Sequence, residues 1–303
     1  MTLKPRLESF ELKVLRSLNI RMNLKINEQS NYMYLKKGYD GERLFDKWLE
    51  TLTNAHLILN DLLLEYNGTV FQIDTLLFYS DKIYHFEVKN YEGDFYIEAD
   101  RWYALTGKEI KNPLLQLKRT ESLLRQLLVK KRFNHTIESY LIFVNPKFHL
   151  YQAPLNLPIV FPTQLTRFME KLKNKHSKLK DSHKKLAKEL LSIHKDETPY
   201  NRLPEYQYDE LEKGLICPLC HSMYTTFKPI LVCNSCGEKE RYPTAVLRAI
   251  EELQTLFPDK KITTSLIYDW CKIIKSKSTI RKTLKKKFKL VGYSKASYFV
   301  NHE

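Results

Sequence analysis

Asp74, Glu87 and Lys89 are the residues of this 303-residue sequence whose types and spacing most favour chemistry. They lie in two runs, 71–79 and 83–90, that are rich in apolar and aromatic residues and flank a short polar turn. Such a pattern predicts a β-hairpin. An acidic pair with a nearby lysine suits the binding of a divalent cation and the activation of water, so we expect metal-assisted hydrolysis at this hairpin.

The register of the hairpin follows from the length of its loop. If Ser80 and Asp81 form a two-residue loop, antiparallel partners have residue numbers that sum to 161. Asp74 then faces Glu87 directly, with Cβ atoms about 5 Å apart. Two carboxylates at that distance repel each other, and a bound Mg²⁺, which prefers oxygen ligands, removes the repulsion.

Two further residues are predicted to join this pair. Side chains two apart on a strand share a face, so Lys89 lies beside Glu87 and can hold or help deprotonate an attacking water. Glu42 begins the apolar stripe of a predicted helix over 41–53 and is interpreted as a residue that points into the site, the alternative being a helix N-terminal charge. The stripe itself consists of Phe45, Leu49 and Leu52.

These residues occur in an order that resembles a known family, the nuclease-related domain (NERD) family of the PD-(D/E)XK nuclease superfamily. The resemblance covers about residues 36–150 and rests on the segments Gly38-Tyr39-Asp40-Gly41-Glu42, Ile73-Asp74, Glu87-Val88-Lys89-Asn90 and Asn112-Pro113-Leu114-Leu115-Gln116. Ile73 stands in place of the proline of the superfamily's name, and this departure is minor because proline supplies no chemistry.

The resemblance implies a restriction-endonuclease-like fold and a set of roles for its residues. Asp74, Glu87 and the Val88 carbonyl would bind Mg²⁺ or Mn²⁺, and Lys89 would serve the water. Glu42 would be a further ligand or water contact, and Gln116 would lie beside the site at the start of the second helix. The non-functional alternative for the hairpin is that Lys89 only forms an ion pair with Glu87 or Asp74. The alternative for Gln116 is that it only caps its helix.

A second metal site is predicted by the cysteines. Two CxxC pairs separated by twelve residues can supply four thiolates to one tetrahedral zinc, in the manner of a zinc ribbon. A site of four cysteines has no open position, so this zinc is expected to be structural. The ligands are Cys217, Cys220, Cys233 and Cys236.

Charge and composition indicate the partner and the compartment. A formal net charge of +15 favours a polyanionic partner, and DNA comes before an acidic membrane surface, with RNA left open. No apolar run is long enough for a membrane span, and the N-terminus lacks a signal core. Cysteines arranged for metal rather than disulfides suit a reducing compartment, so a cytoplasmic location is expected.

The chain is expected to be α/β with additional small modules. A mixed sheet flanked by helices forms the nuclease-like domain at 37–162, after an N-terminal helical segment at 1–36. A lysine-rich helix and a linker occupy 163–212, and the helix either tracks a phosphate backbone or is merely solvated. The zinc ribbon spans 213–242. The last module, 243–303, has three predicted helices and a hairpin and resembles a winged helix-turn-helix.

The last module is strongly basic. Between Lys272 and His302 there is no Asp or Glu, and a third helix near 278–288 would be the recognition helix. Lysines outnumber arginines there, which favours contacts with the DNA backbone over base reading. The alternative is a basic helical cap on the zinc unit.

These patterns together predict an enzyme, an Mg²⁺-dependent nuclease that hydrolyses phosphodiester bonds and is delivered to DNA by its basic C-terminal region. The alternative is a non-catalytic nucleic-acid-binding or regulatory protein with an inactive nuclease fold. An RNA-directed enzyme is a third possibility because phosphates dominate binding to either polymer. Homo-oligomer formation, strand preference and sequence specificity stay open.

Overall fold

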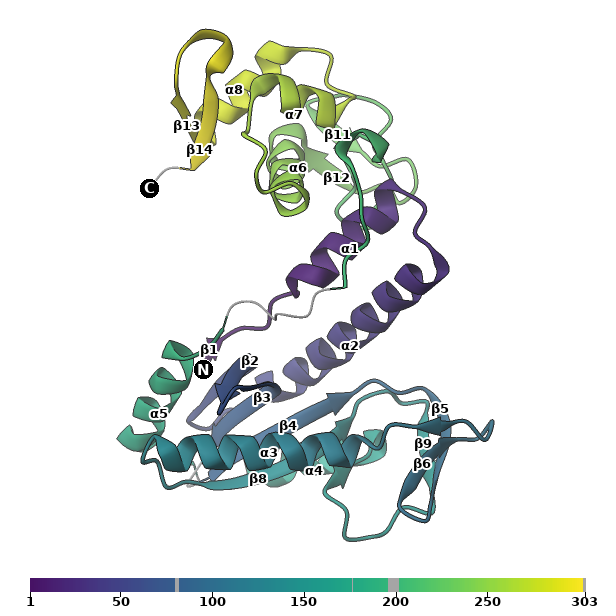
Figure 1. Cartoon of the computed structure of the whole chain (residues 1–303), viewed down its shortest axis with the longest axis vertical. Helices are drawn as coiled ribbons and strands as arrows, with labels where there is room; N and C mark the ends of the chain where they lie inside the picture. The colour runs from purple at the N-terminus through teal and green to yellow at the C-terminus, as the bar shows by residue number, and fades with distance from the viewer. Residues whose placement is uncertain (80–81, 176, 196–201, 302–303) are drawn as a thin grey trace. The chain divides into compact units, whose positions relative to one another are not determined.

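The computed structural model of the protein divides into two compact units. The first contains Met1–Glu8 and Met33–Tyr200, and the second contains Ser9–Tyr32 and Asn201–Glu303. The N-terminal residues are thus shared between the units, because the chain enters a sheet of the first before it forms a helix of the second (Figure 1). The residues described are 1–79, 82–175, 177–195 and 202–301.

The first unit is built on a mixed six-stranded sheet with the order β1-β2-β3-β4-β8-β10. β2, β3 and β4 form an antiparallel meander, whereas β1, β8 and β10 each pair parallel to a neighbour. The strands span β1 (Thr2–Lys4), β2 (His56–Tyr66), β3 (Thr69–Tyr79), β4 (Lys82–Lys89), β8 (Thr136–Phe143) and β10 (Ile159–Val160).

Helices cover both faces of this sheet. One face packs its apolar side chains against α3 and α5, and the other packs against α2 and α4. Alternate residues enter the two cores, as the strand period of two requires, but the alternation shifts by one residue between Leu59 and Leu62 of β2 and between Ile73 and Leu76 of β3. The prediction of a mixed sheet flanked by helices is confirmed. The helices span α2 (Ile26–Glu50), α3 (Pro113–Lys130), α4 (Leu165–Lys173) and α5 (Asp181–Ser192), with a 3-10 turn at Pro162–Gln164.

A smaller sheet with the order β7-β6-β5-β9 adjoins the first turns of α3. Its core contains Trp102, Phe143 and Phe148, and the rings of the two phenylalanines stack with centroids 3.8 Å apart. This cluster anchors the start of α3, which carries Gln116. The strands are β5 (Gly93–Glu98), β6 (Arg101–Ala104), β7 (Glu109–Ile110) and β9 (Phe148–Tyr151).

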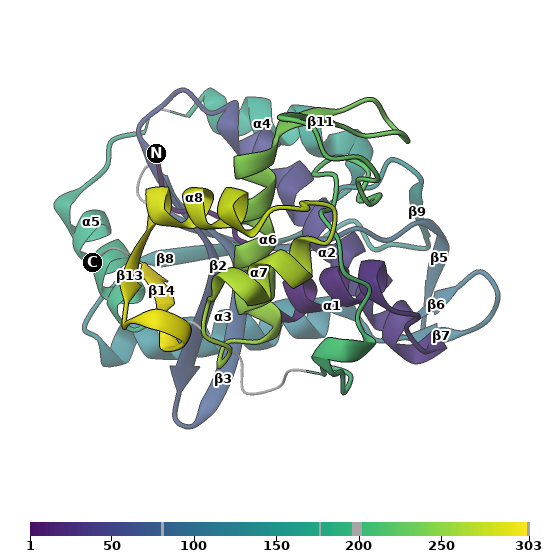
Figure 2. The same ribbon diagram turned by 90° about the horizontal axis from the view of Figure 1, so that it is seen from above.

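The second unit combines α1 with the cysteine region and the C-terminal helices. Val14 and Leu18 of α1 lie in one apolar core with residues of α6, α7 and α8. Figure 2 shows these three helices grouped, with the β13–β14 hairpin after α8, as the winged-helix pattern predicts. The elements are α1 (Phe10–Arg21), a 3-10 turn (Tyr208–Glu210), β11 (Ile230–Val232), β12 (Lys239–Arg241), α6 (Tyr242–Leu256), α7 (Thr264–Cys271), α8 (Lys277–Lys287), β13 (Phe288–Val291), a 3-10 turn (Ser294–Ala296) and β14 (Tyr298–Asn301).

Two expectations about helices need correction. The helix predicted over 41–53 is the second half of α2, which begins at Ile26 and continues through both glycines of its middle. The lysine-rich stretch is not one solvated helix, because α5 buries Leu186, Ala187 and Leu190 in the core of the first unit. Their spacing gives α5 an apolar stripe, which the many lysines obscure in the sequence.

Some expectations fall on residues outside the description. The predicted hairpin loop, Ser80 and Asp81, lies there, as does the first part of the predicted linker. Within the described part of the chain, every helix is too short or too polar to cross a lipid bilayer.

Candidate active site

The β3–β4 hairpin has the register that the sequence predicts. Tyr79 pairs with Lys82, and the ladder continues to Thr75 opposite Phe86. One step further Asp74 comes opposite Glu87, but there the ladder gives way to a side-chain contact. Asp74 Oδ2 accepts a hydrogen bond from the backbone N–H of Val88 at 2.8 Å. The carboxylate of Asp74 is therefore fixed against β4 at the position of Glu87.

Glu87, Lys89 and Gln116 form a closed set of hydrogen bonds. Lys89 Nζ donates to Glu87 Oε1 at 2.7 Å and to Gln116 Oε1 at 3.2 Å. Gln116 Nε2 donates to the same Glu87 Oε1 at 2.5 Å. Gln116 reaches this position from the first turn of α3, whose N-terminus is capped by Asn112 Oδ1 accepting from Leu114 N at 2.9 Å. Gln116 therefore contacts Glu87 and Lys89, and the cap of its helix is Asn112.

The two carboxylate oxygens of Glu87 differ, because Oε1 accepts hydrogen bonds from Lys89 and Gln116 and Oε2 accepts none from the described residues. Glu87 is fully buried, and its Oε2 has no hydrogen-bond partner among the described residues. Burial first, and the charge of Asp74 second, raise the pKa of Glu87 to about 7. For Lys89, burial lowers the pKa, but the charges of Glu87 and Asp74 outweigh it and raise the pKa above its usual value. The lysine is thus protonated at neutral pH.

Glu42 approaches the hairpin from α2. An added Cβ at Gly41 would lie 2.5 Å from the Cβ of Asn90, so only glycine lets α2 pass this close to the end of β4. Asn90 Nδ2 also donates to the Lys37 carbonyl of the same helix at 2.8 Å. Burial and the charge of Asp74 together raise the pKa of Glu42 to about 9, against the opposing effect of Arg6.

Arg6 is a residue of this cluster that the sequence did not indicate. Its Nη1 donates to Glu42 Oε2 at 2.7 Å and to Asp61 Oδ1 at 2.5 Å. Its Nε and Nη2 bind both carboxylate oxygens of Asp46, at 2.9 and 3.2 Å. Nη2 also donates to the Asp74 carbonyl at 3.0 Å. Arg6 lies two residues after the end of the edge strand β1 and is distant in sequence from all of these partners, so no local pattern signals it.

Asp61 was also missed, although β2 carried a signal. In the β2–β3 ladder Asn60 pairs with Thr75 and Leu62 with Ile73, so Asp61 lies opposite Asp74. Its φ of 50° is unusual for a non-glycine residue. Burial raises the pKa of Asp61 to about 6, with Asp74 adding to the rise and Arg6 opposing it. Asn60 and Asp61 interrupt a leucine-rich strand, and this interruption could have indicated a site residue in the sequence.

Donor type and charge at this site fit a hard divalent cation. Asp61 Oδ2 and Glu87 Oε2 are both buried without a hydrogen-bond partner among the described residues. Such oxygens are costly to bury unless a cation or proton compensates them. Glu42, Asp74 and Glu87 do not form a group whose ligand atoms all lie within 4.8 Å of one another. Glu42 is instead ion-paired with Arg6, and Glu87 with Lys89.

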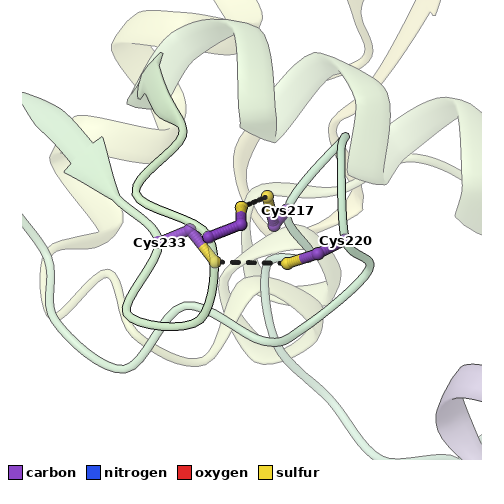
Figure 3. A group of neighbouring side chains, drawn as sticks. Cys217, Cys220 and Cys233 are labelled. Atoms are coloured by element: carbon purple, nitrogen blue, oxygen red, sulfur yellow. Dashed lines mark hydrogen bonds between the residues drawn. The ribbon is translucent and has the colours of Figure 1, made fainter.

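Four cysteines of the second unit do form such a group. The sulfurs of Cys217, Cys220, Cys233 and Cys236 all lie within 4.8 Å of one another, and none is in a disulfide. Sγ distances are 3.6 Å for Cys217–Cys236 and 3.4 Å for Cys220–Cys233, and three of these side chains are labelled in Figure 3. The cluster is consistent with the predicted zinc ribbon, whose short strands here are β11 and β12.

Beyond the cysteines, the C-terminal helix α8 presents an exposed cationic face. Arg281, Lys282, Lys285 and Lys286 are exposed, whereas Ile280, Thr283 and Leu284 on the opposite side are buried. Ser276 caps the helix, with its Oγ accepting from Thr279 N at 3.4 Å. This arrangement has the form expected of a recognition helix, with charge directed away from the core.

Comparison with known proteins gives one finding. Residues 37–144 match the family model described as "Nuclease-related domain", which covers the β3–β4 hairpin, Glu42 and Gln116. No curated protein and no solved structure gave a significant match.

Proposed function

Because residues 37–144 match the family model of the nuclease-related domain, we propose that the chain is a nuclease that hydrolyses phosphodiester bonds in DNA with Mg²⁺ or Mn²⁺. The observation that carries the proposal is the grouping of Asp74, Glu87 and Lys89 on one hairpin, with a buried carboxylate oxygen that has no hydrogen-bond partner among the described residues. A protein that only scaffolds has no need to keep such a costly arrangement.

Each residue has a distinct role in this proposal. Asp74, Glu87 and the Val88 carbonyl hold the cation, which supplies Lewis acidity toward a phosphate oxygen and lowers the pKa of water. Lys89 is protonated, so its Nζ orients the attacking water or a phosphate oxygen by donating hydrogen bonds. It does not act as the base. Gln116 fixes both Lys89 and Glu87 through its amide.

Glu42 is assigned a supporting role. Its Oε2 is engaged by Arg6 at 2.7 Å and burial raises its pKa, so Glu42 is a neighbour of Asp74 rather than a direct ligand. The family resemblance left two roles open for Glu42, ligand or water contact, and the ion pair with Arg6 disfavours the first. A Glu42→Gln variant would therefore keep a bound cation with an affinity close to that of wild type, because glutamine resembles the protonated carboxyl group in size and charge.

In the second unit, the cysteines hold one structural zinc in this proposal. Two sulfurs at corners of a tetrahedron, each about 2.3 Å from the zinc, lie about 3.8 Å apart. The separations of 3.6 and 3.4 Å are close to that value. The basic face of α8 brings the chain to a nucleic-acid backbone, because lysines bind phosphates without reading sequence.

The test is cleavage of supercoiled plasmid, single-stranded DNA and RNA with Mg²⁺ or Mn²⁺, comparing wild type with Asp74→Asn. The matched control is Asp100→Asn, which makes the same change at an exposed turn of the same unit, where asparagine tolerates the φ of 64°. We expect metal-dependent DNA cleavage that Asp74→Asn abolishes and the control retains.

Two other outcomes have definite meanings. If RNA alone is cut, the proposed hydrolysis of phosphodiester bonds is supported and the proposed substrate, DNA, is wrong. If wild type binds nucleic acid in a salt-sensitive way but cuts none of the substrates, the nuclease proposal fails. The chain is then a non-catalytic nucleic-acid-binding protein.

A further inference from the structure

The strongest unexplained feature of the molecule is the buried guanidinium of Arg6. The Arg6 side chain is 2% exposed, and all three of its nitrogens donate to acceptors of the first unit. Nη2 has a further acceptor in Thr75 Oγ1 at 2.9 Å. A guanidinium this enclosed and saturated cannot contact a nucleic acid, so its role must be exerted through the residues around it.

The acidic residues divide into two groups according to their partners. Glu42, Asp46 and Asp61 bind Arg6 directly. Asp74 and Glu87 are not ion-paired with Arg6, which touches Asp74 only at its backbone carbonyl. The site therefore has one group of carboxylates that is ion-paired with a cation of the protein and a second group, Asp74 and Glu87, that is not paired with it.

The charges support the same division. These five carboxylates are accompanied by three cationic side chains, Arg6, Lys89 and Lys4, whose Nζ donates to the Asp61 carbonyl at 3.0 Å. Glu42 keeps its proton at neutral pH, because its pKa is raised to about 9, so four negative and three positive charges leave a net charge of minus one. One divalent cation would leave an excess of one positive charge, whereas two would leave an excess of three in a poorly solvated place.

Nucleases that use two metal ions hold them about 4 Å apart between shared carboxylates. Asp61 and Glu87 lie on opposite sides of Asp74 in the sheet, so Asp74 has an acidic neighbour on each adjoining strand. On the Asp61 side the cation already present is a guanidinium, held by the segment that follows β1. A second metal ion would have to displace it from at least three carboxylates.

We propose that Arg6 takes the place of a second metal ion, so that this nuclease-type site binds a single divalent cation, at Asp74 and Glu87. Arg6 is then a positioning residue that keeps Glu42, Asp46 and Asp61 away from solution cations. The inference rests on the proposed function, since it assumes that the carboxylates of the first unit bind metal at all.

The experiment counts Mn²⁺ bound to the full chain whose cysteines have first been loaded with zinc. Isothermal titration gives the number of ions, and electron paramagnetic resonance distinguishes isolated Mn²⁺ from pairs of ions that couple at about 4 Å. We expect wild type to bind one uncoupled Mn²⁺ in the first unit. Arg6→Met should bind two coupled ions because Glu42, Asp46 and Asp61 are released.

Two variants separate this role from a merely structural one. Arg6→Lys keeps the positive charge and should keep the count at one. Arg21→Met is the matched control, because Arg21 is a buried arginine paired with Glu252 of the second unit. It removes the same group elsewhere, so its Mn²⁺ count should remain one, even if that variant is less stable.

The outcomes distinguish failure of the inference from failure of the proposed function. A coupled pair of Mn²⁺ ions in wild type overturns the inference and leaves the nuclease proposal standing. A count of one in a folded Arg6→Met also overturns it. Wild type that binds no Mn²⁺ in the first unit overturns both. If Arg6→Met does not fold, the counts for wild type and Arg6→Lys decide the matter, and a coupled pair in either one overturns the inference.

Discussion

The raised pKa of Glu87 predicts a measurable dependence of stability on pH. A carboxylate with a pKa of 4.5 in the unfolded chain and about 7 in the folded protein releases its proton first when unfolded. The folded state therefore binds more protons between these values, and the free energy of unfolding falls as pH rises from 4.5 to 7. The shift corresponds to a loss of about 3 kcal/mol, because one pKa unit is about 1.4 kcal/mol.

The Glu87→Gln variant isolates this contribution. Glutamine cannot ionise, so we expect the loss between pH 5 and pH 8 to be about 3 kcal/mol smaller in the variant than in wild type. In a unit of this size that difference corresponds to roughly 6 to 12 °C in melting temperature. Comparing the two proteins removes the contribution of Glu42, whose pKa is raised by the same kind of burial.

The assay is scanning calorimetry in buffers freed of divalent ions by a chelating resin, because a soluble chelator would also remove zinc from the cysteines. Glu98→Gln, the same change at an exposed strand position, should behave as wild type. Mn²⁺ added at pH 8 should stabilise wild type more than Glu87→Gln. If the free energy of unfolding depends on pH equally in wild type and Glu87→Gln, the pKa of Glu87 is not raised in the folded protein.

The other predictions concern catalysis, zinc and DNA affinity. Lys89→Met should slow plasmid cleavage at least about 100-fold while the dissociation constant for DNA stays unchanged, since the lost group acts on the reaction; wild-type rates would exclude its role. Cys220→Ser should lower bound zinc, measured by atomic absorption, from one per chain to none and unfold the ribbon, because small zinc units depend on their metal. Alanine at Lys282, Lys285 and Lys286 together should weaken DNA binding and reduce the slope of log affinity against log salt by about 2 to 3, measured by fluorescence anisotropy. An unchanged slope would place the DNA elsewhere.

Local sequence patterns determined the hairpin and its chemistry. Alternating apolar residues and a short polar turn fixed the register in which Asp74 comes opposite Glu87, because a strand has a period of two and a tight turn allows few registers. The same locality explains the cap at Asn112 and the start of α3. The spacing of the four cysteines likewise predicted a cluster that the fold assembles.

The residue at which α2 begins was harder to predict, because the contacts that extend this helix come from residues elsewhere in the chain. Gly38 and Gly41 would ordinarily weaken a helix, which is why the sequence suggested a start near residue 41. Gly41 is instead required by the close approach of Asn90, and tertiary packing carries α2 through both glycines. Asp61 had a recognisable signal as a polar interruption of an apolar strand, but only the ladder places it opposite Asp74.

The sequence by itself thus determined the types of chemistry: a carboxylate pair with a lysine, a four-cysteine cluster and a basic terminal module. Only the tertiary structure decided how the carboxylates are divided, because Arg6 is brought to them by the pairing of β1 with β2, across more than fifty residues of chain. Periodicity reports which face a side chain occupies within its own element. It carries no information about which distant charge will be buried beside that side chain, and here that charge determines which carboxylates are ion-paired.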